Sequence, residues 1–233
     1  MKNSYRYIFS IIFTLFAFYI FAISSNIVVH YNNANKYRDC NILYDVWKNI
    51  FVNEIDRDTY IVYYTIIDYI PWTLIFINVF AICYQIYKNK KNFIVRVLCA
   101  ESILMIANAI AQIVTILPDP DSDKNICNNE SYSVYGSWIF TRVSSNNCGD
   151  MMWSGHTSHT IFMIILFYWI LMEYEHFKQI KNFKMIYFLF GSVLILFEAN
   201  SLVFLSIHYS VDIYISLLIT PLFLTHPIVL NIN

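Results

Sequence analysis

Two histidines and one aspartate in the second half of the chain combine residue types and a spacing that suit acid–base chemistry. His156 lies in the stretch CGDMMWSGHTSHT (residues 148–160), and His208 lies in IHYSVDIY, where Asp212 is the fourth residue after the histidine. Because residues i and i+4 share a helix face, Asp212 can hold one ring nitrogen of His208 and leave the other as a nucleophile or base. His156 can then serve as the acid. We therefore predict a catalytic site made of His156, His208 and Asp212.

Both histidines are predicted to stand at the beginning of an apolar helix. A helix N-terminus attracts anions such as phosphate, because its dipole is positive there and its first N–H groups lack helical partners. Ser154 and Gly155, directly before His156, allow the backbone to turn tightly. A single histidine in such a place most often only caps the helix or anchors it at the headgroup level. Two of them at one depth favour chemistry, with His159 as a competitor for the role of His156.

The elements that must position these residues are transmembrane helices. The chain has 233 residues, of which 58% are hydrophobic and 13% charged, with a mean hydropathy of +0.50, more apolar than a soluble domain needs to be. A helix crosses a bilayer with about 20 apolar residues, and the sequence lacks the alternation typical of a barrel. We predict an all-α polytopic membrane protein, a single domain over residues 1–233 with six transmembrane helices. Their predicted ranges are 7–29, 60–87, 93–117, 157–174, 183–205 and 209–231.

Lysine and arginine mark the predicted cytosolic side. They gather near the N-terminus and in the two short connections between spans, and the positive-inside rule places such segments in the cytosol. The long loops 30–59 and 118–155 are richer in acidic residues and are predicted on the lumenal or exoplasmic side. The fourth and sixth spans both start from that side, so their histidines should lie at the same depth. The first apolar run also resembles a secretory signal, but its length favours a retained anchor.

Polar residues inside the predicted spans form a second group of candidates, because ionisable groups are costly in a bilayer. Glu101, Asn108, Gln112 and Thr115 share one face of the third span and draw a polar stripe along it. Hydrogen bonding between helices explains Asn108 and Gln112 better than substrate contact does. The roles of Glu101 and Glu198 stay open.

The cysteines divide between the two sides of the membrane. In the predicted outer loops, an oxidising compartment would favour a disulfide between Cys127 and Cys148. None of the spacings fits a zinc site, and we expect no metal and no other cofactor.

The two histidine motifs together resemble the sphingomyelin synthase family, which is related to the lipid phosphate phosphatases. The similarity lies in CGD and SGHT within 148–157 and in HYSVD at 208–212. In addition, VTILPDP at 114–120 is similar to the family's segment at the end of its third helix. Either histidine motif alone is a weak signal, whereas the two in tandem are specific. The resemblance implies a lipid phosphate phosphatase-like helical bundle.

The resemblance implies transfer of a phospho-alcohol headgroup from a glycerophospholipid donor to the primary hydroxyl of a ceramide acceptor, with diacylglycerol as the product. The family's His-His-Asp triad falls on His156, His208 and Asp212. We expect a phosphohistidine at His208, with His156 as the proton donor and then the acceptor. An acid and an aromatic before SGH suit a cationic headgroup. The expected substrate-binding residues are Asp150, Trp153, Ser154, Gly155 and Tyr209.

The implied partners are therefore membrane lipids, and no nucleic acid is expected. The choice between choline, ethanolamine and inositol headgroups stays open, as does a homo-oligomer. The expected location is the Golgi, the endoplasmic reticulum or the plasma membrane, with the site on the lumenal or exoplasmic side.

Departures from the family pattern keep other functions open. Asn108 stands where the family carries an arginine, for which Arg142 in the preceding loop is a candidate substitute. A phospholipase C-like hydrolase that uses water and an inactive relative are alternatives. A lipid phosphate phosphatase would use the same histidines, but would have proline at Trp153 and arginine at Leu202. The non-enzyme alternative is a polytopic scaffold or transport protein.

Overall fold

The computed structural model describes residues 2–35, 57–88, 90–114, 154–204 and 210–226, and these residues form α-helices and a few short turns, without a strand. The prediction of an all-α fold is confirmed for this part of the chain. The helices are α1 (Lys2–Asn35), α3 (Arg57–Tyr87), α4 (Lys91–Val114), α6 (Gly155–Leu171), α7 (Glu175–Gln179), α8 (Phe183–Phe204) and α9 (Ser210–Leu224).

Each of the six predicted spans falls on one of these helices, but only four of the helices are long and apolar enough to cross a membrane. The four stretches are Tyr5–Ser24, Tyr69–Tyr87, Lys91–Ala111 and Phe183–Phe204. With 17 and 15 residues, α6 and α9 are apolar but shorter. The chain is thus a multi-pass membrane protein, and the crossing of the membrane by α6 and α9 stays a prediction.

Several helix ends differ from the ends of the predicted spans. α1 continues to Asn35 and α3 begins at Arg57, so both helices extend into the segment predicted as the first long loop. α6 stops at Leu171, before the predicted end at 174, and Met172 caps the helix with its N–H still donating to Tyr168 O at 3.0 Å. α9 stops at Leu224, before the predicted end at 231. The residue that precedes a proline disfavours the helical conformation, and Pro227 follows shortly after.

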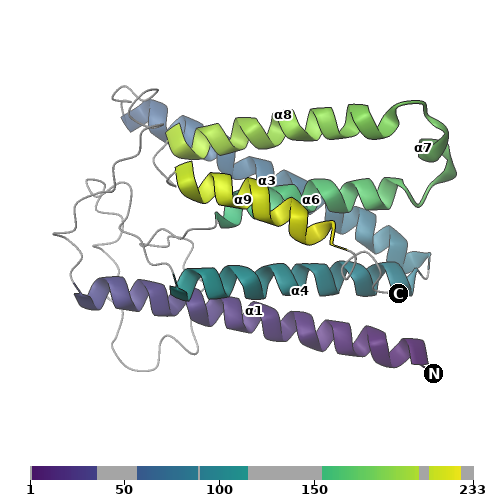
Figure 1. The fold of residues 1–233 in the computed structure, drawn as a ribbon, viewed down its shortest axis with the longest axis horizontal. Helices are drawn as coiled ribbons and strands as arrows, with labels where there is room; N and C mark the ends of the chain where they lie inside the picture. Colours follow the sequence, from purple (N-terminus) through teal and green to yellow (C-terminus); the bar gives the residue numbers. More distant parts are fainter. Residues whose placement is uncertain (1, 36–56, 89, 115–153, 205–209, 227–233) are drawn as a thin grey trace.

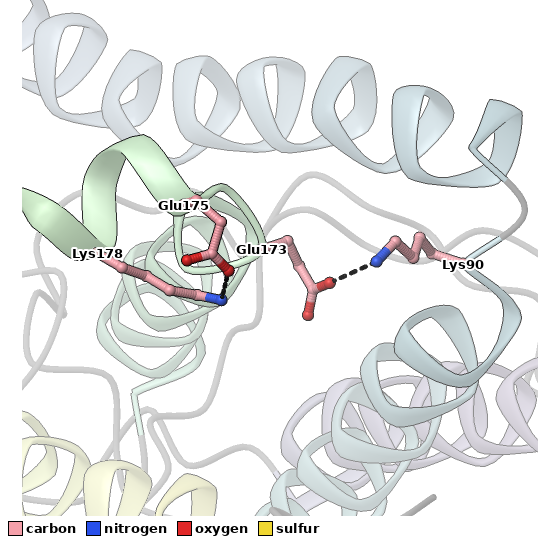
Figure 2. A network of polar contacts seen from close by, with 4 residues as sticks. All are labelled: Lys90, Glu173, Glu175 and Lys178. Atoms are coloured by element: carbon pink, nitrogen blue, oxygen red, sulfur yellow. Dashed lines mark hydrogen bonds and ion pairs between the residues drawn. The ribbon is translucent and has the colours of Figure 1, made fainter.

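Apart from the short α7, the helices lie side by side, and each runs opposite to the one before it in the sequence (Figure 1). The N-terminus, α7 and the turn between α3 and α4 lie at one end, whereas α6 and α9 both begin at the other. Figure 2 shows ion pairs at the first of these ends: Lys90 Nζ lies 3.1 Å from Glu173 Oε2, and Lys178 Nζ lies 2.6 Å from Glu175 Oε1. The basic connections predicted on one side of the membrane therefore meet at one end of the bundle.

At the centre of the bundle lies α6, which packs against α3, α4, α8 and α9. Its sequence is apolar almost all round, as expected for a helix surrounded by others. Phe162 and Leu166 are buried and join the core formed with Leu104 of α4 and Leu224 of α9. By contrast, α1 packs chiefly along α4, where Ser102 Oγ donates to Thr14 Oγ1 at 2.9 Å. The central place of α6 means that its first turn is fixed by several neighbours.

Close approach between α6 and α8 depends on a glycine. A Cβ added to Gly191 would lie 2.9 Å from Ile164 Cγ2, inside normal van der Waals contact. Small residues allow membrane helices to approach in this way. Near this contact the Tyr187 hydroxyl donates to Ile164 O at 2.7 Å. On the α3 side, Asn78 Nδ2 donates to Met163 O at 3.2 Å.

Candidate active site

The first turn of α6 carries His156. Ser154 caps the helix in an extended conformation, and its side chain accepts a hydrogen bond from Thr157 N at 3.3 Å. Serine is a favoured cap because its oxygen satisfies an N–H that has no helical partner. Gly155 is the first helical residue and does not adopt a left-handed backbone conformation, so the turn itself does not require glycine there. His156 follows as a half-buried residue.

The first turn of α9 lies directly against this cap. Ser154 N donates to Asp212 O at 3.5 Å, and Ser216 Oγ donates to both Ser154 O at 3.2 Å and Asp212 O at 2.8 Å. The Asp212 side chain is fully buried. Two helices that are distant in sequence thus bring the turn of His156 and the turn of Asp212 into contact. Because both turns are helix N-termini, their dipoles favour negative charge at this place.

His208 lies outside the described residues, which resume at Ser210, where α9 begins. The proximity of His156 and His208, and the i, i+4 relation between His208 and Asp212, therefore stay predictions. Asp150, Trp153 and Tyr209 also lie outside the described residues, as do Arg142, Cys127 and Cys148. Ser154, Gly155, His156 and Asp212 are the predicted site residues that the structure describes, and it brings their two turns together.

His159, the predicted competitor of His156, has partners for both ring nitrogens. Its Nδ1 lies 2.9 Å from Gly155 O, and its Nε2 lies 3.3 Å from Glu101 Oε1 of α4. The ring is therefore used to join α4 to the first turn of α6. His159 thus has a contact between helices, and its competition with His156 for the catalytic role stays a prediction.

The second acidic residue whose role was open, Glu198, contacts α6 from α8. Thr160 Oγ1 donates to Glu198 Oε1 at 2.8 Å, and both side chains are fully buried. Glu101 and Glu198 thus bond to neighbouring residues of α6, His159 and Thr160. Their presence inside apolar spans was the signal in the sequence, but the partners on α6 were not identified from it.

Asn108 of α4 lies beside the start of α6. Its side chain is fully buried, and its Nδ2 is 3.8 Å from the position that a Cβ on Gly155 would take. We expected Asn108 to serve helix packing; the structure places it beside the residue that precedes His156. This distance is an ordinary contact, so Asn108 of α4 lies against the start of α6.

No group of three or more histidine, cysteine or acidic side chains fit to hold a metal ion occurs among the described residues. Cys83 and Cys99, the cysteines that the structure describes, are free thiols.

Fold and site together define a multi-pass helical membrane protein in which two helix N-termini meet around a histidine and a buried carboxylate. Residues 147–227 match the family model described as PAP2 superfamily C-terminal. This range contains all of α6, α7, α8 and α9, the segment that builds the site. The match supports the lipid phosphatase and phosphotransferase superfamily and an enzyme of that general type. No curated protein and no solved structure matches the chain.

Proposed function

We propose that the chain is a membrane phospholipid:ceramide headgroup transferase that uses His156, His208 and Asp212. The observation that carries this proposal is the contact between the cap of α6 and the first turn of α9, with Ser154 N and Asp212 O 3.5 Å apart. His208 lies two residues before Ser210, where α9 begins. The start of α9 contacts the cap of α6, the helix whose first turn carries His156.

In the first half-reaction, the side chain of Asp212 orients the ring of His208, and the unprotonated ring nitrogen attacks the phosphorus of the donor phospholipid. A phosphorus–nitrogen bond forms while the bond from phosphorus to the glycerol oxygen breaks. His156 gives its proton to that oxygen, and diacylglycerol leaves. The headgroup stays attached to His208 through its phosphate.

In the second half-reaction, His156 takes the proton of the ceramide primary hydroxyl. The hydroxyl oxygen attacks phosphorus, the phosphorus–nitrogen bond breaks, and His208 returns to its starting state. Each histidine ends the cycle with the protons it had at the start, so the scheme needs no added co-reactant.

Two features of the site suit a phosphodiester. The N-termini of α6 and α9 direct positive dipole ends toward one place, which favours the negative charge that develops on the phosphate oxygens. Gly155 has no side chain at the start of α6, and a Cβ at this position would be in ordinary contact with Asn108 Nδ2 at 3.8 Å. We assign Ser154 and Gly155 to contact with the phosphate, and Asp150, Trp153 and Tyr209 to contact with the headgroup.

The decisive assay uses purified protein in liposomes that contain fluorescent ceramide and one donor phospholipid at a time. The donors are phosphatidylcholine, phosphatidylethanolamine and phosphatidylinositol. We expect a new sphingophospholipid and diacylglycerol in equal amounts with at least one donor. Diacylglycerol without the sphingophospholipid would replace the proposal with a phospholipase C-like hydrolase. Inorganic phosphate released from phosphatidic acid would replace it with a lipid phosphatase, and absence of all products would favour a scaffold.

A protein-bound intermediate gives a second test. With a donor labelled with ³²P in its phosphate and no ceramide, we expect label on the protein that is stable in base and lost in acid, as a phosphorus–nitrogen bond requires. His208→Ala should abolish that label, whereas His156→Ala should slow its formation. Label that survives in His208→Ala would assign the nucleophile to another residue.

A further inference from the structure

One contact of the first turn of α6 has no place in the proposed chemistry: the contact between Glu101 of α4 and His159. Both side chains are largely buried, with 16% and 22% of their surfaces exposed. Glu101 Oε1 lies 3.3 Å from His159 Nε2, and His159 Nδ1 lies 2.9 Å from Gly155 O. A chain of contacts therefore runs from α4 through His159 to the carbonyl that directly precedes His156.

The protonation of Glu101 and His159 follows from the group that His159 Nδ1 contacts, the carbonyl oxygen of Gly155. A backbone carbonyl only accepts hydrogen bonds, so His159 Nδ1 carries a proton. A hydrogen bond between Nε2 and Glu101 then needs one more proton, on either the ring or the carboxyl group. In both cases Glu101 and His159 together have no net charge. This neutrality makes the pair tolerable among the apolar side chains of the bundle.

Gly155 O belongs to the peptide group that also contains the N and Cα of His156. Because a peptide group is planar, holding its oxygen also holds the N and Cα of His156, the atoms from which its side chain starts. Ser158 Oγ donates to the same oxygen at 3.1 Å. Two side chains thus fix this oxygen, and one of them, His159, is tied to another helix.

We propose that Glu101 and His159 form a positioning pair that holds His156 in its reactive orientation by fixing the Gly155 carbonyl relative to α4. The inference rests on the proposed role of His156 as the acid and base. Neither residue touches the lipid in this account, and both act through the backbone of α6. The pair should therefore affect the rate of the chemical step rather than the binding of the lipid.

A double replacement separates positioning from mere stability. Exchanging a buried pair of polar residues for apolar ones of similar size is often neutral or stabilising, so Glu101→Leu/His159→Leu should fold. We expect its kcat to fall by about 10- to 100-fold, with KM within about threefold of wild type, because small misplacements of reacting groups have effects of this size. A folded double variant with the wild-type kcat would overturn the proposal.

The conservative variant should rescue activity. In Glu101→Gln the amide N–H can donate to the unprotonated Nε2 of a neutral His159, so the contact to Gly155 O survives. We expect a kcat within about threefold of wild type. A folded Glu101→Gln that is as slow as the double variant would contradict the proposal.

The matched control is Ser102→Ala, one residue further along α4. Ser102 is fully buried and bonds to Thr14 of α1, away from the Glu101–His159 pair. This variant should lower thermal stability slightly and leave kcat unchanged. A loss of kcat equal to that of the double variant would mean that any disturbance of α4 slows the enzyme, which would overturn the specific role of the pair.

Hydrogen exchange measured by mass spectrometry tests the pair without relying on turnover. In nanodiscs, the peptide over residues 154–160 should exchange faster in the double variant than in wild type, and at the wild-type rate in Ser102→Ala. Unchanged exchange in the double variant would overturn the positioning role. If the wild-type protein turned over no lipid, the proposed function alone would fail, and the exchange result would still decide whether the pair holds the first turn of α6.

Discussion

The two ends of α6 use polar residues in opposite ways. At its beginning, Ser154, Thr157, Ser158 and Thr160 are fully buried. Side chains or backbone groups at this end of α6 contact Glu101 of α4, Glu198 of α8 and Ser216 of α9. Beyond its other end, the charged residues lie in exposed turns, and the Lys90–Glu173 pair joins side chains that are 51% and 33% exposed. One end places polar groups in the interior, whereas the other leaves them in solvent.

The difference follows from solvation. A buried polar atom that loses its partner has no water to replace it, so each contact at the first turn is costly to remove. An exposed ion pair loses little, because water solvates both charges when they separate. Loss of a polar contact at the beginning of α6 should therefore destabilise the protein more than loss of one at its other end. In the proposed function, the beginning of α6 also carries the reacting residue.

The largest expected effect is the loss of activity in His156→Ala. We expect kcat to fall by about 1000-fold or more, because the acid and base of both half-reactions would be absent. The measurement is sphingophospholipid formation in liposomes. His176→Ala is the control, since His176 lies in the short α7 at the opposite end and should keep the wild-type rate. An equal loss of kcat in His156→Ala and His176→Ala would contradict the proposal that only the beginning of α6 takes part in the reaction.

The second largest expected effect is a difference in stability between the alanine variants of two glycines, Gly191 and Gly155. In Gly191→Ala the new Cβ would meet Ile164 Cγ2 at 2.9 Å, so α6 and α8 must separate, and we expect stability to fall by about 1–3 kcal/mol. In Gly155→Ala the new Cβ would meet Asn108 Nδ2 at 3.8 Å, an ordinary contact, so stability should hardly change. Unfolding midpoints in SDS-containing mixed micelles would compare them. A more destabilised Gly155→Ala would contradict this packing.

Thr160→Val is expected to have a smaller effect. It keeps the shape of the side chain but removes the hydrogen bond to Glu198 Oε1, which is 2.8 Å long and fully buried. Hydrogen bonds between membrane helices contribute about 1 kcal/mol, so stability should fall by roughly that amount. The double variant Thr160→Val/Glu198→Leu should recover much of the loss, because position 198 would no longer carry a buried carboxyl group. Unfolding midpoints of the single and double variants measure both effects.

The smallest effect is expected from Lys90→Ala at the exposed end. The pair with Glu173 is solvated, so its removal should change stability by no more than about 0.5 kcal/mol, and less at high salt. The same unfolding assay at two salt concentrations provides the measurement. A loss as large as that of Thr160→Val would show that the contrast between the two ends is not a matter of burial.

Much of the fold could be predicted from the sequence, because apolar runs report burial in lipid directly. All six predicted spans fall on helices, and the start of α6 lies two residues before its predicted position. The contact between the cap of α6 and α9 follows from topology, since both helices begin at the same end. Helix ends were less predictable, because capping contacts and prolines stop a helix within a run that remains apolar.

The polar contacts of α6 could be predicted only in part. Glu101 and Glu198 were conspicuous as acids inside spans, but their partners depend on how each helix is rotated about its axis, which periodicity does not give. The placement of Asn108 beside Gly155 also depends on helix rotation, so the sequence did not predict it. The His156–His208 pair was predicted from motifs, and it remains a prediction because His208 lies outside the described residues.

The shortness of α6 and α9 has a consequence for how a lipid would reach the site. A helix of 17 residues measures about 26 Å and one of 15 about 22 Å, both less than the roughly 30 Å of hydrocarbon in a bilayer. At the end where both helices begin, α3, with 31 residues, extends past them (Figure 1). A bilayer accommodates short apolar helices by thinning locally. In the proposed function, such thinning would bring the phosphate of a phospholipid toward the first turns of α6 and α9 while its acyl chains remain in the membrane.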